Sequence, residues 1–413
     1  MRILYLLTQD LESPAGAGRF FPLARELAKR GHQVSIAALH ANYASLGRTR
    51  FTLEGVDVHY VGQMHVLKQG ARKSYFPAHK LLGISLRAAW GLSRAALNSP
   101  ADLVHVGKPH PMNGMAGLLF QILKRRPFVL DCDDLEVQNL HFSGKWQRGV
   151  IAFFENNLPR RANHVTTHNS TLAAFLENLG VPRDKISDLP NGVDVQRFDT
   201  INPERIQALH QSLNLEDKPV VAYVGSLSTP NHPVHLLLSA FKIVQQEFPE
   251  AVLLVVGGGE DYDTLIRQSQ QLGIYPSCRF TGRIPAAEIP VYYRLASVVV
   301  DPVEDNPVGR TRLPIKLFES WASQVAFVTA DVGDRRRVLG EPPAGLLAPP
   351  GDAAGLAAAI GRVLSSPDLA ASLRERGQQR AQEYTWEKLA LRMEALYQRL
   401  LGSSSPAPER SNP

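Results

Sequence analysis

Two charged residues lie three positions apart in the stretch LPIKLFESWAS, just before the apolar run VAFVT. Pro314 suits the first turn of a helix, and Lys316 and Glu319 would then share one face of it. A helix start with a nearby lysine attracts a diphosphate, and a carboxylate one turn later offers two acceptor oxygens to a ribose diol. The pattern indicates a nucleotide-sugar site, although an ordinary surface ion pair has the same spacing.

Three carboxylates follow another apolar run in the stretch VLDCDDLE, namely Asp131, Asp133 and Asp134. They come at the end of a predicted strand, so we expect them to face a ligand cleft. Clustered carboxylates bind metals, act as bases or raise one another's pKa. Capping of a following helix by Asp133 or Asp134 is the alternative, and we favour a functional role for the cluster.

Glycines mark two further positions. Gly16 and Gly18 lie in SPAGAGRF, between the first predicted strand and helix, where a backbone can approach an anion closely. A tight strand-to-helix turn would use glycine equally well. The pair Asn191-Gly192 predicts a turn with positive φ at Gly192, which we interpret as a hinge between two domains.

Strands and helices alternate along the whole chain. In the first half the apolar runs predict strands over 2–8, 33–39, 56–61, 102–107, 127–131 and 164–167, with helices over 20–31, 112–124, 145–158 and 170–179. In the second half strands are expected over 219–225, 251–259, 278–282, 297–302 and 325–329, with helices over 232–247, 261–272, 286–294 and 314–323. The alternation predicts an α/β protein with two doubly wound parallel sheets.

Domain limits follow from this double pattern. We expect a Rossmann-like domain over 1–195, a second over 196–385, a helix over 386–402 that returns toward the first domain, and a disordered tail over 403–413. Ligands of open parallel sheets bind outside the carboxyl ends of the strands. The cleft between the two domains is therefore the expected site.

The composition is that of an ordinary globular protein, with 44% hydrophobic and 20% charged residues among 413. The first apolar stretch is too short to be a membrane span, and no secretory signal is recognised. Cys132 and Cys278 are too few for a disulfide framework and show no metal spacing. We expect a cytoplasmic protein.

Positive charge is concentrated in the first half. Residues 1–195 hold 23 Lys and Arg against 15 Asp and Glu. The window 58–101 has no acidic residue and six basic ones: Lys68, Arg72, Lys73, Lys80, Arg87 and Arg94. Apolar residues lie among them, including Leu81, Ile84, Leu86 and Trp90. The window either attaches to an anionic membrane surface or packs its apolar side into the core.

Five segments in order resemble a known family: SPAGAGRFFPLARELAKRGHQV, VPRDKISDLPNGVDVQRF, VAYVGSLSTPNHPVHLLLSAF, FTGRIPAAEIPVYYRLASVVVDPV and LPIKLFESWASQVAFVTADVGD. They look like the retaining glycosyltransferases of the GT-B fold known as family 4, over nearly the whole chain. The resemblance implies transfer of a sugar from a nucleotide-sugar donor with no metal or cofactor. The donor would bind mainly the C-terminal domain and the acceptor the N-terminal one.

The resemblance also implies roles for particular residues. Glu319 matches the ligand of the donor ribose, and Gly18, Gly225, Ser226, Arg283 and Ile284 match other donor contacts. Lys316 is the best candidate for a catalytic phosphate contact, and Gly16, Arg310, Arg312 and Leu317 are further donor-binding candidates. Asp133 aligns with the family's active-site histidine and is the other catalytic candidate, while Asp131, Asp134 and His110 would lie on the acceptor side.

This sequence departs from the family at several of those positions. Thr311 replaces the first of two glutamates, and Ser226 and about Asn231 replace an arginine and a lysine that clamp the diphosphate. We expect Lys316, with Arg310 or Arg312, to substitute for that clamp. A nucleotide-sugar 2-epimerase and a binding protein without turnover remain alternatives. The basic window favours a lipid-linked or polysaccharide acceptor, and we expect no nucleic-acid partner.

Overall fold

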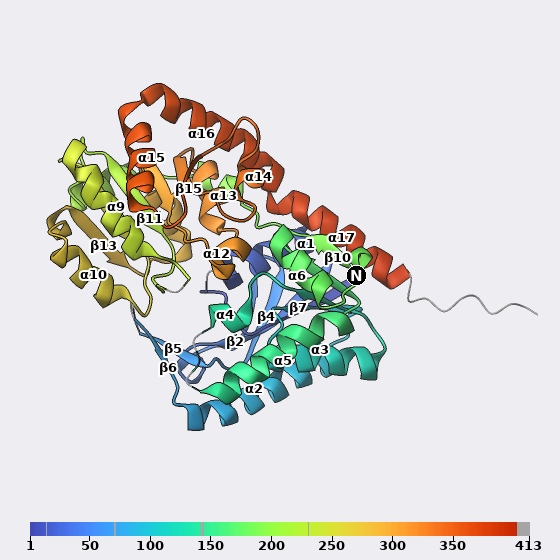
Figure 1. The fold of residues 1–413 in the computed structure, drawn as a ribbon. Helices are drawn as coiled ribbons and strands as arrows, with labels where there is room; N and C mark the ends of the chain where they lie inside the picture. Colours follow the sequence, from blue (N-terminus) through green and yellow to red (C-terminus); the bar gives the residue numbers. More distant parts are fainter. Residues whose placement is uncertain (14, 70–71, 141, 143, 230, 403–413) are drawn as a thin grey trace, which may run out of the picture.

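The computed structural model describes residues 1–413 except 14, 70–71, 141, 143, 230 and 403–413. Two α/β domains, each with a central sheet covered by helices on both faces, lie against one another (Figure 1). The predicted fold class is confirmed. The predicted disordered tail lies outside the described residues.

The N-terminal sheet has the strand order β10-β9-β8-β7-β1-β2-β4-β3, and all of its pairs are parallel except that of β3 with β4. Its strands are β1 (Arg2–Leu7), β2 (Gln33–His40), β3 (Arg50–Leu53), β4 (Val56–Gln63), β7 (Leu103–Gly107), β8 (Phe128–Asp131), β9 (His164–Thr167) and β10 (Ile186–Asp188). Its main helices are α1 (Phe21–Lys29), α2 (Ala78–Asn98), α3 (Pro111–Lys124), α4 (Glu136–Asn139), α5 (Lys145–Arg161) and α6 (Ser170–Asn178). A separate hairpin joins β5 (Val66–Gln69) to β6 (Arg72–Tyr75).

The C-terminal sheet is parallel throughout, in the order β13-β12-β11-β14-β15-β16. Its strands are β11 (Val220–Val224), β12 (Val252–Val256), β13 (Cys278–Gly282), β14 (Val298–Asp301), β15 (Ala326–Ala330) and β16 (Leu346–Ala348). Its helices are α7 (Val195–Asp199), α8 (Pro203–Ser212), α9 (Val234–Glu247), α10 (Tyr262–Gln271), α11 (Ile289–Arg294), α12 (Pro307–Thr311), α13 (Ile315–Ala322), α14 (Arg335–Leu339), α15 (Ala353–Ser365) and α16 (Pro367–Ala381). Every residue of β11, β12 and β14 is buried, as expected for strands covered on both faces.

The predicted strands and helices lie within a few residues of the observed ones. The pattern missed β3, β5, β6, β10 and β16, which are three or four residues long. Such short segments give too little alternation to be recognised. The 58–101 window proves to hold most of β4, the hairpin and helix α2.

The last helix, α17 (Trp386–Gly402), leaves the C-terminal domain and packs on the N-terminal one, against α1 (Figure 1). Its Leu389, Met393 and Tyr397 join the core formed by β1 and α1. The Tyr397 hydroxyl lies 2.6 Å from Nδ1 of His105 on β7 and 3.3 Å from the Tyr5 hydroxyl on β1. One helix of the second half of the chain thus completes the first domain.

Gly192 does not adopt the positive φ that the Asn-Gly pair predicts. A Cβ atom there would lie 2.8 Å from Cδ1 of Leu389 and 2.8 Å from Cδ2 of Trp386, both on α17. The backbone beside it pairs with the start of that helix, because Val193 N–H donates to Tyr384 and Trp386 N–H donates to Val193. The close approach of α17, rather than a turn, requires this glycine.

We expect Gly192→Ala to destabilise the protein by about 1–3 kcal/mol, since the added methyl group overpacks the contact with α17. The midpoint of thermal unfolding, followed by circular dichroism, should fall. Gly149→Ala in α5 is the matched control, because a Cβ atom there meets nothing within 4 Å. Alanine in a helix should raise stability by about 0.5–1 kcal/mol. Equal midpoints for Gly192→Ala and the unaltered protein would contradict this packing role.

Candidate active site

Loops of the N-terminal domain meet the segment that leads into α13. The Leu313 carbonyl accepts from Nδ2 of Asn191 at 2.7 Å, and the Leu313 N–H donates to Nε2 of His168 at 3.3 Å. A Cβ atom on Gly18 would lie 2.8 Å from Cδ1 of Ile315, the first residue of α13. Gly18 lies in the π-helical turn Gly16–Phe20, which leads into α1, and not in a loop. This turn of one domain therefore lies directly against the start of α13 in the other.

Three cations converge beside this contact on one carboxylate. Asp301, the last residue of β14, is fully buried. Its Oδ1 lies 3.0 Å from Nη2 of Arg312 and 3.0 Å from Nζ of Lys316, and its Oδ2 lies 3.2 Å from Nη2 of Arg335. We call Asp301, Arg312, Lys316 and Arg335 the Asp301 cluster.

The Asp301 cluster carries a net positive charge. Although burial opposes it, the three cations hold the pKa of Asp301 well below its usual range. Burial lowers the pKa of Lys316 to about 8, despite the attraction of Asp301. Burial and the same cations hold the pKa of neighbouring His232 far below normal, so that it is neutral. A cluster with three cations and one anion is suited to binding a polyanion.

Lys316 is also positioned by the loop after β11. Its Nζ lies over the Tyr223 ring, 3.9 Å from the ring centre. Gly225 follows with a φ of 154°, and a Cβ atom there would lie 3.3 Å from the same Nζ. The Tyr223 hydroxyl donates to the Ser226 carbonyl at 2.8 Å. The structure thus brings Gly225, Ser226 and Lys316 together, as the sequence predicts.

Glu319 lies one turn further along α13, partly buried. Its Oε2 accepts from the Tyr293 hydroxyl at 2.9 Å, and its Oε1 lies 3.9 Å from Arg197. Burial raises its pKa, while Arg197 and Tyr293 oppose the shift. Neither Lys316 nor Glu319 forms the surface ion pair that their spacing also allowed, because each has other partners in the part of the chain that is described.

The remaining donor-side candidates separate into two groups. Arg312 belongs to the Asp301 cluster, but the Arg310 guanidinium pairs with Asp305 on the surface, with 2.5 Å between Nε and Oδ1. The Leu317 side chain is buried in the hydrophobic core of the C-terminal domain, and Ile284 packs at its margin. Arg283 faces the carboxylates of Asp10 and Glu12, which oppose the lowering of its pKa by burial.

Asp131, the last residue of β8, is held by Arg19 from the π-helical turn Gly16–Phe20. Nη2 of Arg19 lies 2.8 Å from Oδ2 of Asp131, and both side chains are buried. Thr166 donates to the same oxygen at 2.9 Å, and Arg19 also donates to Asn191. Despite the cost of burial, Arg19 and His105 lower the pKa of Asp131. Asp131 therefore contributes to the frame of the site and is not exposed to an acceptor.

Asp133 and Asp134 belong to a second cluster of carboxylates, which surrounds the ammonium group of Lys108. Nζ of Lys108 lies 2.8 Å from Oδ1 of Asp133, 2.7 Å from Oδ2 of Asp134 and 2.8 Å from Oε1 of Glu136. Nε2 of His110 lies 2.7 Å from the other oxygen of Glu136, so His110 also belongs here. Three acidic groups this close could hold a metal ion, but the ammonium group already supplies a cation to each of them.

Burial and the neighbouring carboxylates of Asp134 and Asp131 raise the pKa of Asp133 to about 7, although Lys108 opposes the shift. Glu155 accepts from the backbone N–H of Glu136 at 2.5 Å, and burial raises its pKa to about 7 as well. Asp133 can therefore change protonation near neutral pH, which is the property required of a proton-handling group.

The sequence did not identify several residues of the site: Arg19, Lys108, Glu136, Tyr223, Tyr293, Asp301 and Arg335. Asp301 gave a usable signal, since an aspartate ends the apolar run SVVVD just as Asp131 ends FVLD. Arg335 gave none, because it lies in a different segment from Arg312 and Lys316 and meets them only in the fold.

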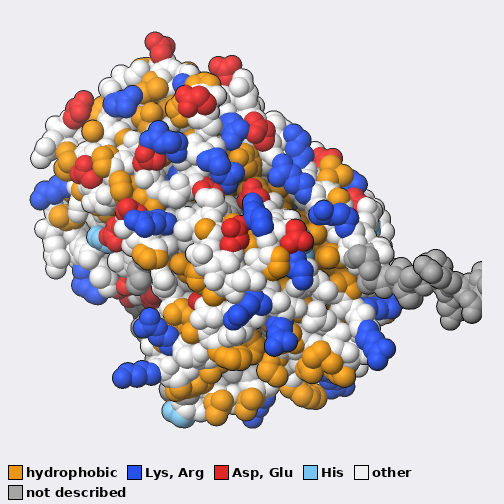
Figure 2. Space-filling view, turned by 45° about the vertical axis from the view of Figure 1, so that its right-hand side comes forward, with side chains coloured by type: hydrophobic (Ala, Val, Ile, Leu, Met, Phe, Trp, Pro, Cys, Tyr) orange, Lys and Arg blue, Asp and Glu red, His pale blue; other side chains and the backbone are white. Residues whose placement is uncertain are grey.

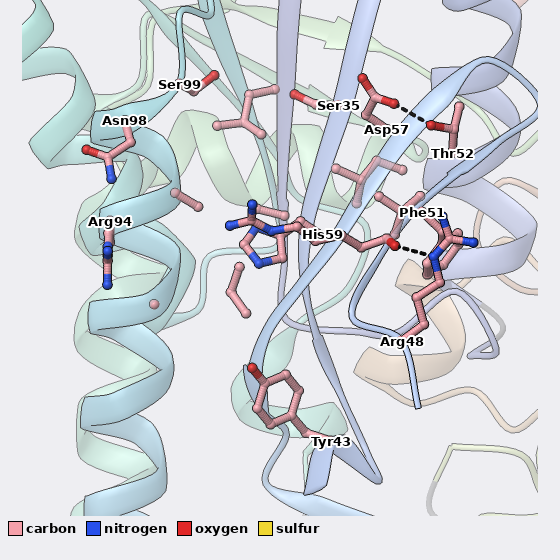
Figure 3. Close-up of a pocket in the computed structure, with 18 of the residues that line it drawn as sticks. Ser35, Tyr43, Arg48, Phe51, Thr52, Asp57, His59, Arg94, Asn98 and Ser99 are labelled. Carbon is pink, nitrogen blue, oxygen red and sulfur yellow. Dashed lines mark hydrogen bonds between the residues drawn. The ribbon is translucent and has the colours of Figure 1, made fainter. Parts of the chain in front are cut away.

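A groove lies outside the domain interface, between α2 and the strands β2, β3 and β4 (Figure 3). It is lined by Arg48, Arg50, His59 and Arg94, together with Trp90. Its carboxylate, Asp57, accepts from the Thr52 hydroxyl at 2.7 Å. The groove is thus basic, and it is not part of the site described above.

Comparisons with known proteins agree with this arrangement. The chain is similar in structure to sucrose-phosphate synthase from Thermosynechococcus elongatus, with a TM-score of 0.74, 20% identity and coverage of 98% of this chain and 100% of the other. It is also similar to HepE from Anabaena in complex with UDP-glucose, with a TM-score of 0.73, 19% identity and coverage of 97% and 100%. These likenesses define the fold as that of the GT-B glycosyltransferases.

Two family models match the sequence. Residues 205–380 match the model for glycosyl transferases group 1, and residues 16–192 match the model for the glycosyl transferase 4-like domain. Together the two models span most of the chain, which belongs to the group 1 glycosyl transferases. The family that the sequence resembles is confirmed.

Curated relatives match a smaller part of the chain. A GDP-mannose-dependent alpha-(1-6)-phosphatidylinositol monomannoside mannosyltransferase of Mycolicibacterium smegmatis is 28% identical over 205 residues, covering 49% of this chain and 53% of that protein. Mannosylfructose-phosphate synthase of Agrobacterium fabrum is 25% identical over 319 residues, covering 74% and 66%. The match to the first of these spans about half the length of each protein.

Affinity for inorganic pyrophosphate should fall as the pH rises from 7 to 9, because the Lys316 ammonium group loses its proton near pH 8. The loss should approach tenfold per pH unit above that pKa. Asp301 stays ionised over this range, His232 and Tyr223 stay neutral, and burial lowers the pKa of Arg335 only to about 10. Isothermal titration calorimetry measures the affinity.

Lys316→Met should bind pyrophosphate weakly at pH 7 and show little change up to pH 9. Arg310→Met is the matched control and should follow the unaltered protein, since Arg310 is engaged with Asp305 on the surface. A profile for the unaltered protein that does not change between pH 7 and 9 would contradict the role of Lys316.

Proposed function

We propose that this protein transfers a sugar from a nucleoside-diphosphate sugar to an acceptor, with retention of the anomeric configuration and without a metal ion. The observation that carries the proposal is the Asp301 cluster at the start of α13, with Glu319 one turn further on. A group of cations next to a partly buried carboxylate fits a diphosphate joined to a ribose. Membership of the group 1 glycosyl transferases supports the same reaction.

On the donor side each residue has a distinct task. Lys316 and Arg312 contact the diphosphate and neutralise the charge that grows on it as the sugar leaves. Gly225 and Gly18 allow the loop after β11 and the π-helical turn before α1 to approach the phosphates. Glu319 accepts from the ribose hydroxyl groups, with Tyr293 holding one of its oxygens.

On the acceptor side the resemblance implies attack by an acceptor hydroxyl on the face from which the diphosphate departs. Asp133 orients that hydroxyl or stabilises the developing cation on the sugar, and its pKa of about 7 suits either protonation state. Lys108 and His110 hold the carboxylates around it. No protein nucleophile is needed in this scheme, because the leaving diphosphate can receive the acceptor proton.

The acceptor is proposed to be lipid-linked or part of a polysaccharide. Two relatives are named for phosphatidylinositol substrates, and one of them depends on GDP-mannose. Those names support a mannosyl donor and a lipid acceptor as the first to be tried. The epimerase and the inactive binding protein are not favoured, since both matching family models describe glycosyl transferases.

Replacing Glu319 by alanine should weaken binding of the best nucleotide sugar by about 2–3 kcal/mol, the size of a lost hydrogen bond to a charged group. A thermal-shift panel of nucleotide sugars, GDP-mannose among them, identifies that ligand, and calorimetry measures its affinity. Glu288→Gln is the control, because Glu288 pairs with Arg205 on the surface. Unchanged affinity in a folded Glu319→Ala protein would refute the assignment.

Turnover of the identified donor should be the same with and without EDTA, and added Mg²⁺ or Mn²⁺ should not raise it. The reason is that Nζ of Lys108 already lies among the carboxylates of Asp133, Asp134 and Glu136, where a metal ion would bind. Loss of activity in EDTA, restored by Mg²⁺, would contradict this. The activity of Glu12→Gln with Mg²⁺ would then show whether the metal binds at the other set of possible metal ligands, formed by Asp10, Glu12 and His40.

A further inference from the structure

Three neighbouring helices of the N-terminal domain expose apolar side chains on their outer surface. Those on α2 are Leu82, Leu86 and Trp90, those on α3 are Met115, Ile122 and Leu123, and those on α5 are Trp146, Val150 and Phe153. Each is between 39% and 66% exposed. Helix α3 packs against both α2 and α5. We call this surface the α2–α3–α5 face; Figure 2 shows hydrophobic side chains gathered at the lower end of the molecule, where these helices lie in Figure 1.

Residue spacing shows that these side chains form stripes. Leu82, Leu86 and Trp90 follow one another at intervals of four, and so lie on one side of α2. A different side of the same helix packs into the core, where Leu81 and Leu92 are buried. The view that Leu86 and Trp90 pack in the core is therefore wrong, although it holds for Leu81. The outward stripe is not needed to fold the domain.

Charge on the α2–α3–α5 face has one sign. The exposed basic residues on its helices and the loop after α3 are Lys80, Arg87, Arg94, Lys124, Arg125, Lys145, Arg148, Arg160 and Arg161. Among the residues of α2, α3 and α5 the sequence has a single carboxylate, Glu155. It is buried and accepts from the backbone N–H of Glu136, so it does not offset the positive charge outside.

The basic groove continues this charge around the edge of α2. Trp90 and Arg94 line it from the helix, while Arg50 lines it from β3 and Arg48 from the loop just before that strand (Figure 3). The Arg94 guanidinium also lies 5.3 Å from the centre of the Trp90 ring. An aromatic ring beside a guanidinium group is a common arrangement at the boundary between hydrocarbon and lipid headgroups.

We propose that the α2–α3–α5 face rests on an anionic lipid bilayer. Its leucines and aromatic rings would enter the interfacial layer, and its Lys and Arg side chains would contact lipid phosphates. A second copy of the chain fits less well, because a symmetric interface would set two uniformly basic surfaces against each other. Attachment is peripheral, since no helix in the described residues is long and apolar enough to cross a membrane.

The inference deepens the proposed function. Only the biological reason for binding a bilayer rests on that function, whereas the binding itself is argued from the surface. A bilayer under the N-terminal domain would bring lipid-linked acceptors to the domain expected to bind them. The surface differs from the one expected from the sequence, because α3 and α5 contribute as much as the 58–101 window.

Co-sedimentation with phosphatidylcholine vesicles, with or without phosphatidylglycerol, tests the proposal. The protein should pellet with the anionic vesicles and be released at high salt. Two triple variants should each bind at least tenfold more weakly. The apolar variant is Leu86→Ser/Trp90→Ser/Phe153→Ser, and the charge variant is Arg87→Gln/Arg94→Gln/Arg148→Gln. For the charge variant the expected loss is roughly fivefold per basic residue removed. Leu391→Ser on α17 and Lys242→Gln on α9 are exposed control variants and should bind like the unaltered protein.

Three results would overturn the proposal: no pelleting with anionic vesicles at low salt, equal pelleting with neutral ones, or equal losses in the control variants. Sedimentation velocity without lipid tests the rival occupant, since a dimer that Trp90→Ser dissociates would make the face a protein interface. Nucleotide-sugar affinity, measured without lipid, is a separate readout. Vesicle binding without nucleotide binding would refute the proposed function and leave this inference standing.

Discussion

The donor half of the site depends on one buried carboxylate. Asp301 ends a central strand, and three cations from two segments reach it: Arg312 just before α13 and Lys316 within it, and Arg335 at the start of α14. Without its charge these groups would repel one another in a region that water does not reach, a loss typically of about 3–5 kcal/mol for a broken buried pair. The carboxylate therefore fixes the positions of two helices while leaving a surplus of positive charge beside the domain interface.

The N-terminal domain repeats this arrangement with one cation. Asp131 also ends a central strand and binds Arg19, which comes from the π-helical turn before α1. Arg19 donates to Asn191, and Asn191 donates to Leu313 next to the cation cluster. The two buried carboxylates are thus joined through a short series of polar contacts that crosses between the domains.

The fold was predictable because its buried strands are unbroken apolar runs, such as VVAYV and VLLVV, separated by helical patterns. Lys316 and Glu319 were recognised because one short helix holds both. Sequence could not choose between Arg310 and Arg312, since the choice depends on which side chain reaches Asp301. The sequence also predicted the wrong reason for a glycine at position 192. That glycine is required by the close approach of a helix almost two hundred residues further along the chain. Local patterns reveal elements and helix faces, whereas contacts between distant segments require the folded structure.

Helix α17 has a consequence for how such proteins can be recombined. The polypeptide passes from the first domain to the second after β10 and comes back just ahead of Trp386, and the two passages lie side by side at Val193. The C-terminal domain is in this sense an insertion within the N-terminal one. A chimera that exchanges donor specificity between relatives must therefore be joined at both passages. A single joint would pair β1 and α1 with a foreign helix and leave the Tyr5–His105–Tyr397 contact unmatched.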